Sequence, residues 1–179
     1  RGRGGAGFPA GIKWRTVADQ APAPHAGESQ NAPAHKYICV NADEGDSGTF
    51  ADRMLMEGDP FCLLEGMTIA AHAVGADRGL VYLRSEYPDA IATLQSAIWI
   101  AREQGWLGDN ILGSDLCFDV EIRVGAGSYV CGEETAMLES LEGRRGMVRA
   151  KPPLPAIKGL FGTPTVINNV LTIASVPSI

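Results

Sequence analysis

The chain has 179 residues, 45% of them hydrophobic, which is enough for one sizeable core. Acidic residues outnumber basic ones by 21 to 15, and the net charge of −6 argues against binding to nucleic acid or to a membrane surface. No apolar run approaches the roughly 20 residues that cross a bilayer, and no signal peptide is recognisable. We expect a cytoplasmic protein without membrane insertion. Because Arg1 already stands on a glycine-rich segment, we expect a piece of a longer protein.

Four of the first seven residues are glycine, with Arg1, Arg3 and Lys13 on either side and Phe8 in the middle. Glycine backbone can approach a flat or phosphorylated ligand closely, and successive N–H groups can bind an anion. The segment is not a P-loop, because Trp14 follows the lysine, and no strand precedes it as in a dinucleotide-binding turn. It predicts a ligand-binding loop, with a plain turn as the alternative.

Hydrophobic periodicity predicts an alternation of strands and helices after residue 36. Residues 15–36 are rich in alanine, proline and small polar residues and predict a surface loop. The order strand, helix, strand, helix, strand, helix predicts an α/β fold with a mostly parallel sheet and helices on both faces. The expected elements are a strand at 37–40, a helix at 60–74, a strand at 80–83, a helix at about 88–104, a strand at about 117–124 with one solvated face, and a helix ending near residue 142.

Two of the three expected strands run directly into polar or glycine-rich turns, Asn41–Gly48 and Gly125–Glu134. In parallel sheets, ligands bind beyond the carboxyl ends of the strands. We therefore expect the two turns to open on the same edge of the sheet. The glycines of the second turn, at the start of a helix, could hold a phosphate or a ring with backbone N–H groups and the helix dipole.

Acidic side chains gather on the same two turns. Glu133 and Glu134 could simply complement a helix dipole, but Asp43, Glu44 and Asp46 lie on the other turn. Carboxylates in a cleft accept hydrogen bonds from sugar hydroxyls. Combined with N–H groups that bind anions, they predict a phosphorylated polyol such as a nucleotide or a flavin.

Asn168 and Asn169 could bind the ligand or cap a helix, and the sequence leaves both interpretations open.

The four cysteines have no Cys-x-x-Cys spacing, so the sequence indicates no zinc or iron–sulfur site, and we expect mostly buried, reduced thiols. No Ser-His-Asp or Cys-His arrangement stands out. If the chain is an enzyme, we expect a bound cofactor to do the chemistry.

Five segments of the chain are distinctive, namely Arg1–Trp14, Asn41–Glu44, Gly125–Glu134, Lys151–Pro153 and Ile167–Asn169. In this order, they resemble the FMN- and NADH-binding domain of the complex I flavoprotein subunit family. That family includes diaphorase subunits of NAD-reducing hydrogenases and beta subunits of soluble NAD-dependent formate dehydrogenases. Residues Gly45–Phe61 look closest to the formate dehydrogenase branch. The resemblance implies a Rossmann-like FMN-binding domain over residues 1–179, without the ubiquitin-like and iron–sulfur domains that follow in the family.

The resemblance also implies a division of labour among cofactor-binding residues, and it includes no metal ligand. NADH would contact Asp46, Lys151 and the catalytic residue Glu134, and Phe8 would stack on its adenine. Tyr129 would lie beside the flavin, and Glu44 belongs to the same cofactor-binding set. The residues along FMN would be Gly2, Arg3, Gly4, Gly5, Lys13, Asn41, Asp43, Gly132, Glu133, Asn168, Asn169 and Thr172.

The implied activity is that of an NADH:acceptor oxidoreductase, in which FMN takes a hydride from NADH and passes single electrons to iron–sulfur clusters. The expected partners are a thioredoxin-like 2Fe–2S subunit and a catalytic subunit. We expect that catalytic subunit to oxidise formate, and the alternatives are a hydrogenase or complex I. A 4Fe–4S cluster is expected in the full-length protein, outside this sequence. Leu154 departs from the family, which often has an aromatic residue there. One alternative is a nucleotide-binding scaffold without redox activity. A hydrolase is a less favoured alternative, because no nucleophile is evident.

Overall fold

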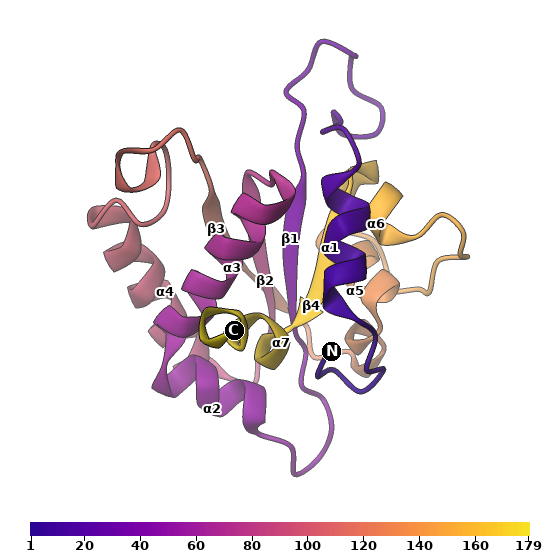
Figure 1. The fold of residues 1–179 in the computed structure, drawn as a ribbon. Helices are drawn as coiled ribbons and strands as arrows, with labels where there is room; N and C mark the ends of the chain where they lie inside the picture. Colours follow the sequence, from indigo (N-terminus) through magenta and orange to yellow (C-terminus); the bar gives the residue numbers. More distant parts are fainter.

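A sheet of four parallel strands forms the centre of the computed structural model, which describes residues 1–179 (Figure 1). The strand order is β3-β2-β1-β4, so β1 is paired on both sides. The predicted α/β class with a parallel sheet is confirmed. The strands are β1 (Tyr37–Ala42), β2 (Arg78–Arg84), β3 (Asp119–Gly125) and β4 (Thr165–Asn169).

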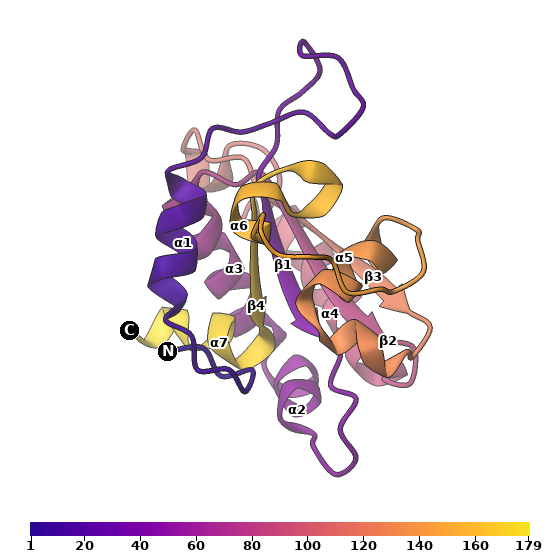
Figure 2. The same cartoon turned by 90° about the vertical axis from the view of Figure 1, so that its right-hand side faces the viewer.

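Helices cover both faces of the sheet, as predicted, and Figure 2 shows α1, α3 and α7 on one side and α5 and α6 on the other. The alternating residues of β1 explain the layers, because successive side chains point to opposite faces. Ile38 and Val40 join a core cluster of 27 buried residues, whereas Cys39 joins a cluster of nine. The helices are α1 (Ala10–Ala18), α2 (Ala51–Gly58), α3 (Pro60–Val74), α4 (Pro88–Glu103), α5 (Glu134–Leu141), α6 (Pro155–Lys158) and α7 (Val170–Ala174).

The two long helices follow the sequence pattern. Both α3 and α4 begin with a proline in the first turn, where its missing N–H is not needed. Gly75 ends α3 in the left-handed region, at φ 71°, which glycine adopts without strain. The expected boundaries at 60–74 and about 88–104 therefore agree with the structure to within one residue.

Three elements differ from the sequence prediction. Residues 10–18 form α1, so the glycine-rich loop ends at Pro9 and the expected surface loop starts only after residue 18. Helix α2 follows the Asn41–Gly48 turn, where no helix was expected. The segment Thr165–Asn169 is a fourth strand that pairs with β1, where the sequence predicted no strand.

Lys36 fixes α1 against α3. Its ammonium donates hydrogen bonds to the carbonyl oxygens of Val17, Ala18 and Val74, at 3.0, 3.2 and 2.9 Å. These carbonyls belong to the last turns of the two helices, where a cation is favoured. Lys36 is only 4% exposed, and burial lowers the pKa of its ammonium. Because α1 is held in this way, the glycine-rich segment that precedes it has a fixed end.

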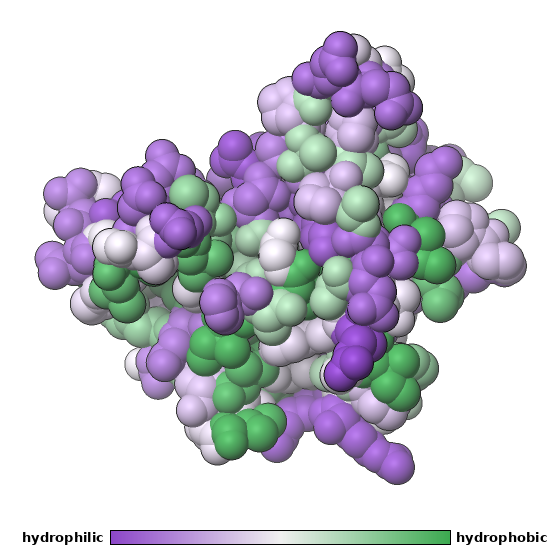
Figure 3. Space-filling view, turned by 45° about the horizontal axis from the view of Figure 1, so that its top comes forward, coloured by the Kyte–Doolittle hydropathy of each residue, from purple (hydrophilic) through white to green (hydrophobic).

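The surface in Figure 3 is mostly hydrophilic, with hydrophobic residues in separate patches. The large exposed apolar side chains include Trp99, Trp106 and Ile12. None of the helices has both the length and the apolar character that a bilayer crossing requires.

Candidate functional site

A cavity of about 550 Å³ opens at the carboxyl ends of β1 and β4. Successive strands β1, β2 and β3 build the sheet in one direction from β1, and β4 is added on the other side. The cavity therefore lies where the strand order reverses, which is where α/β sheets bind their ligands. Its volume is in the usual range for small-molecule and cofactor sites.

A second hollow of about 690 Å³ adjoins the cavity and shares Gly4, Asn41, Gly132, Glu133 and Asn169 with it. Every cofactor-binding residue expected from the sequence lines one of the two. The cavity is lined by Gly2, Phe8, Lys13, Glu134, Lys151, Asn168 and Thr172 besides the shared residues. The second hollow adds Arg3, Gly5, Asp43, Glu44, Asp46 and Tyr129. The structure thus brings all of these residues together, although contact with a cofactor stays a prediction for each of them.

The glycine-rich segment is held against the other end of the chain. The backbone N–H of Arg3 donates to Oγ1 of Thr172 at 2.8 Å. A Cβ atom on Gly4 would lie 3.1 Å from Cβ of Asn169, so glycine permits this close approach. Gly5 has a φ of +96°, which glycine adopts more easily than other residues. The loop lies along the cavity with its backbone exposed.

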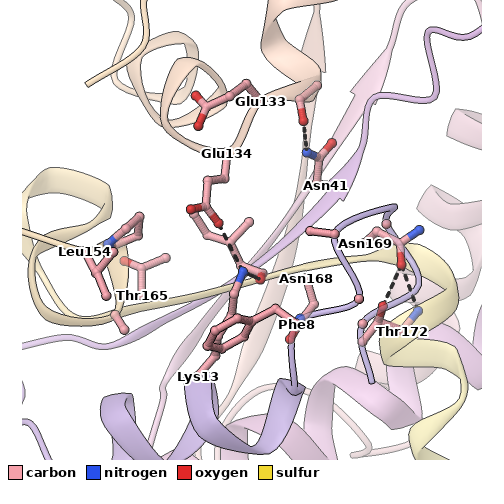
Figure 4. A pocket seen from close by; sticks show the side chains of 18 of the residues that line it. Phe8, Lys13, Asn41, Glu133, Glu134, Leu154, Thr165, Asn168, Asn169 and Thr172 are labelled. Carbon is pink, nitrogen blue, oxygen red and sulfur yellow. Dashed lines mark hydrogen bonds and ion pairs between the residues drawn. The ribbon is translucent and has the colours of Figure 1, made fainter. Parts of the chain in front are cut away.

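The two neighbouring asparagines have different roles. Asn169 caps α7, because its Oδ1 accepts hydrogen bonds from N and Oγ1 of Thr172 at 3.0 and 2.7 Å (Figure 4). Asn168 uses its Oδ1 to accept a hydrogen bond of 2.9 Å from Nε1 of Trp14, and its N–H₂ group donates to no atom of the chain. Of the two readings that the sequence left open, capping applies to Asn169. Asn168 keeps a donor free at the cavity.

Two lysines hold Glu134 at the mouth of the cavity. Its carboxylate accepts hydrogen bonds from Nζ of Lys151 at 2.7 Å and from Nζ of Lys13 at 3.1 Å (Figure 4 shows the Lys13 pair). Burial raises the pKa of Glu134, but the hydrogen bonds and charges of Lys151 and Lys13 outweigh burial, so its pKa lies below the ordinary value. Glu134 is therefore an ionised acceptor at neutral pH.

Glu133 points in a different direction and caps α5. Its Oε2 accepts hydrogen bonds from the N–H groups of Thr135 and Ala136, at 2.8 and 2.9 Å, and its Oε1 accepts one from Lys151. This is the complement to a helix N-terminus that the sequence offered as the alternative reading. Of the adjacent pair, Glu134 is the one that bridges α5 to Lys13 of α1.

Glu44 also caps a helix. Its two carboxylate oxygens accept hydrogen bonds from the N–H groups of Asp52 and Arg53, both at 3.1 Å, at the start of α2. Asp52 is only 7% exposed, and its carboxylate accepts a hydrogen bond of 3.2 Å from Nδ2 of Asn169. Burial, and next the charge of Glu44, raise the pKa of Asp52 to about 6. Sequence reasoning missed Asp52, although Asp52 follows the Asn41–Gly48 turn closely.

The two turns meet at one edge of the sheet, as predicted. Nδ2 of Asn41 donates to the carbonyl oxygen of Gly132 at 2.8 Å, and the Tyr129 hydroxyl donates to Asp46 at the same distance. The first contact joins the end of β1 to the turn after β3, and the second joins the turn after β1 to the same turn. The site therefore contains the expected acids, amides and glycines in one place.

Comparison with known proteins identifies the family. The model of the Nuo51 FMN-binding domain matches residues 1–178. The chain belongs to this family. The FMN-binding domain is 55% identical over its whole length to an NADH-quinone oxidoreductase subunit of Rhizobium meliloti (strain 1021), of which it covers 40%. It is 51% identical, again over its whole length, to the NADP-reducing hydrogenase subunit HndC of Solidesulfovibrio fructosivorans, of which it covers 34%.

The fold also has a solved counterpart. An NAD+-reducing [NiFe]-hydrogenase in the H2-reduced state matches 99% of the FMN-binding domain with a TM-score of 0.81 and 43% identity, and the match covers 28% of the hydrogenase chain. The α/β fold expected from the sequence is thereby confirmed. The FMN-binding domain spans about 40% or less of the length of these relatives.

The residues of the site fit FMN. The backbone of Gly4 and Gly5 lines the second hollow, and the position of a Cβ atom on Gly5 is open space, so a flat ring or a phosphate can approach the backbone N–H groups there. Lys13 supplies positive charge, and Asn168 supplies an unused amide donor. The buried carboxylate of Asp43 can accept hydrogen bonds from a polyol. This donor and acceptor set matches a phosphorylated, hydroxylated, partly flat molecule.

Proposed function

We propose that this FMN-binding domain is the NADH-reacting part of a flavoprotein NADH:acceptor oxidoreductase, a diaphorase module. It would exchange a hydride between NAD(H) and FMN and pass single electrons on to iron–sulfur clusters. The observation that carries the proposal is the gathering of all predicted FMN and NADH residues around two adjoining hollows at one edge of the sheet. Relatives named as NADH-quinone oxidoreductase and NADP-reducing hydrogenase subunits support it.

The protein's own task is to bind and orient. FMN, when bound, supplies the conversion between a two-electron and two one-electron transfers. Phe8 and Tyr129 present rings that are 47% and 71% exposed, and such faces can stack on a planar ligand. Lys13 and Lys151 place two ammonium groups at the cavity, where Lys13 can contact FMN and Lys151 can contact NADH. Glu134, held between them, is an acceptor for a hydroxyl of NADH. Such positioning is what hydride transfer requires, because the reacting atoms must come close together.

The complex that this module serves is a narrower proposal. Residues Gly45–Phe61 favour a soluble NAD-dependent formate dehydrogenase, with a 2Fe–2S electron-transfer subunit and a formate-oxidising subunit as partners. The named relatives instead favour a complex I flavoprotein subunit or a hydrogenase diaphorase subunit. Identification of the subunits that copurify with the full-length protein separates these possibilities. A molybdenum-containing formate-oxidising subunit supports the first, and a nickel–iron subunit or membrane subunits contradict it.

The redox proposal is tested with the purified full-length protein under anaerobic conditions. We expect a yellow protein with the flavin absorption bands, whose absorbance at the longer-wavelength band is lost when NADH is added. Release of the cofactor by heat and chromatography against authentic FMN identifies it. A colourless protein that still binds NADH would contradict the redox proposal and favour the nucleotide-binding scaffold.

A further inference from the structure

Arg84 occupies a central position at the site without being one of the residues that the sequence pointed to. It is the last residue of β2, between β1 and β3. Its Nη1 donates to Oδ1 of Asp43 in the turn after β1, at 2.9 Å. Its Nη2 donates to the carbonyl oxygen of Gly127 in the turn after β3, at 3.0 Å. One guanidinium therefore joins both turns that line the second hollow, in addition to the contact between Asn41 and Gly132.

The surrounding backbone leaves room for this side chain. A Cβ atom on Gly45 would lie 2.6 Å from Nη1 of Arg84, closer than real Cβ contacts allow. Gly127 has a φ of +79°, and a Cβ atom there would lie 2.5 Å from Oε1 of Glu86. Glu86 in turn accepts a hydrogen bond of 2.9 Å from Nη2 of Arg84. Both turns thus have glycine at the positions where a larger residue would displace Arg84 or its partner.

The ion pair of Arg84 with Asp43 is almost out of contact with solvent. The Asp43 side chain is 2% exposed and that of Arg84 is 14% exposed. Burial raises the pKa of Asp43, and the hydrogen bond and charge of Arg84 oppose that rise. Removing one partner of a buried pair leaves an uncompensated charge, which is the costly case. Without Arg84, the Asp43 carboxyl would therefore take up a proton at a higher pH.

We infer that Arg84 is a positioning residue for FMN, which holds the turns after β1 and β3 at a fixed separation and keeps Asp43 available as an ionised acceptor. This inference rests on the proposed function, because it concerns the same site. Arg84 does not line either hollow, so its effect on FMN would pass through Asp43 and the Gly127 backbone. A direct ligand contact by Arg84 is not part of the inference.

The test uses the full-length protein, stripped of flavin, and measures the Kd of FMN by quenching of flavin fluorescence. The variants are Arg84→Met and Arg84→Lys. The matched control is Arg102→Met, because Arg102 also makes three hydrogen bonds, to Asp119 and the carbonyl oxygen of Val120, but at the other end of β3. Thermal unfolding of each apoprotein records the effect on stability separately.

We expect the Kd of FMN to rise on the order of tenfold in Arg84→Met and about threefold in Arg84→Lys, since lysine keeps the charge but cannot bond both turns at once. In Arg102→Met the Kd should stay within about twofold of wild type, because its contacts are remote from the site. If Arg84→Met does not fold, Arg84→Lys decides alone. A wild-type Kd in the folded Arg84 variants would overturn the inference.

A pH profile adds a readout that loss of stability would not produce. The ratio of the Kd of Arg84→Met to that of wild type should increase as the pH is lowered, because Asp43 without Arg84 takes up its proton at a higher pH than in wild type. The FMN phosphate titrates in both proteins and cancels in the ratio. The other titratable or charged groups that face Asp43 or line the same hollow are Tyr82, Glu86, Arg3, Glu44, Asp46, Asp52, Tyr129 and Glu133.

The double variant Asp43→Asn with Arg84→Met completes the test. The Kd of FMN for the double variant should exceed that of Asp43→Asn alone by less than about threefold. The ratio of these two Kd values should not depend on pH, because the Asp43 charge is absent from both proteins. A tenfold additional loss would overturn the role of Asp43. Wild-type protein without FMN affinity would overturn the proposed function, and this inference with it. Wild-type affinity together with unaffected Arg84 variants overturns only the role of Arg84.

Discussion

Replacement of Glu134 by glutamine separates the NADH role of the site from its FMN role. The carboxylate lies 2.7 Å from Nζ of Lys151 and 3.1 Å from Nζ of Lys13, and its side chain is 26% exposed. Glutamine keeps the shape and one acceptor oxygen but loses the charge. Under the proposed function, the change removes a charge-assisted hydrogen bond from an NADH hydroxyl and leaves FMN contacts in place.

Two effects of opposite sign decide the magnitude. A hydrogen bond to a charged group contributes about 1.5–3 kcal/mol. Removing a negative charge also relieves repulsion of the NADH phosphates, which amounts to about 0.5–1 kcal/mol for charges roughly 8 Å apart at an effective dielectric constant of about 40–80. The loss of the hydrogen bond outweighs the relief of repulsion. The net loss of about 1–2 kcal/mol corresponds to a rise of about 5- to 30-fold in the KM for NADH.

The assay is steady-state reduction of an artificial electron acceptor by NADH, with bound flavin quantified from absorbance. The KM for NADH should rise in Glu134→Gln while the flavin content stays at the wild-type level. Glu121→Gln is the matched control, because Glu121 is an exposed carboxylate paired with Arg123 on β3. Loss of flavin with an unchanged KM for NADH would refute the division of roles between Glu133 and Glu134.

Three further predictions follow from burial and close contacts. Folding raises the pKa of Asp52 from 3.8 to about 6, so its protonated form stabilises the fold below about pH 4 and this contribution is lost as the pH rises through 6. In urea unfolding, the stability of wild type relative to Asp52→Asn should fall by up to about 3 kcal/mol between pH 4 and pH 7, and a constant difference would contradict this. Gly66→Ala should destabilise the protein by about 1–3 kcal/mol or more in the same assay, because its Cβ would collide with the backbone carbonyl of Ile173 in α7. Gly11→Ala, with no atom within 4 Å of the added Cβ, should be neutral or stabilising by up to about 1 kcal/mol. Cys117 is the one exposed free thiol, so a thiol reagent should modify it first in native protein. The buried thiols of Cys39 and Cys131 should react only after unfolding, and rapid modification of either in native protein would contradict this prediction.

The sequence predicted the elements whose signals are local. The positions of prolines and glycines predicted the ends of α3 and α4 correctly, and runs of apolar residues predicted β1 and β2. β4 was missed because Thr165–Asn169 is five residues long and runs into α7 without a turn, so its apolar residues merge with those of the helix. Helix α1 was missed because it follows a glycine-rich segment directly.

The site was predictable as a set of residues but not as a set of contacts. Spacing along the chain indicated that Asp43, Glu133 and Glu134 belong to one edge, because parallel strands bring their carboxyl ends together. The sequence allowed a role at the helix N-terminus for Glu133 and for Glu134, but it did not indicate that Glu133 caps the helix while Glu134 bridges two lysines. Arg84 was missed for a similar reason, since only the sheet order places the end of β2 between the turns after β1 and β3.

The anchoring of the glycine-rich loop has a consequence for biosynthesis. The backbone of Arg3 is fixed by the hydroxyl of Thr172, 169 positions later, and Trp14 is bonded to Asn168 across 154 positions. A ribosome exposes the loop first and its anchors much later, so the nascent chain carries an unanchored loop until the anchor residues have left the exit tunnel. Under the proposed FMN-binding role of the loop, flavin insertion would be a late event in the synthesis of the polypeptide, and chains that end before β4 would lack the anchors of the loop.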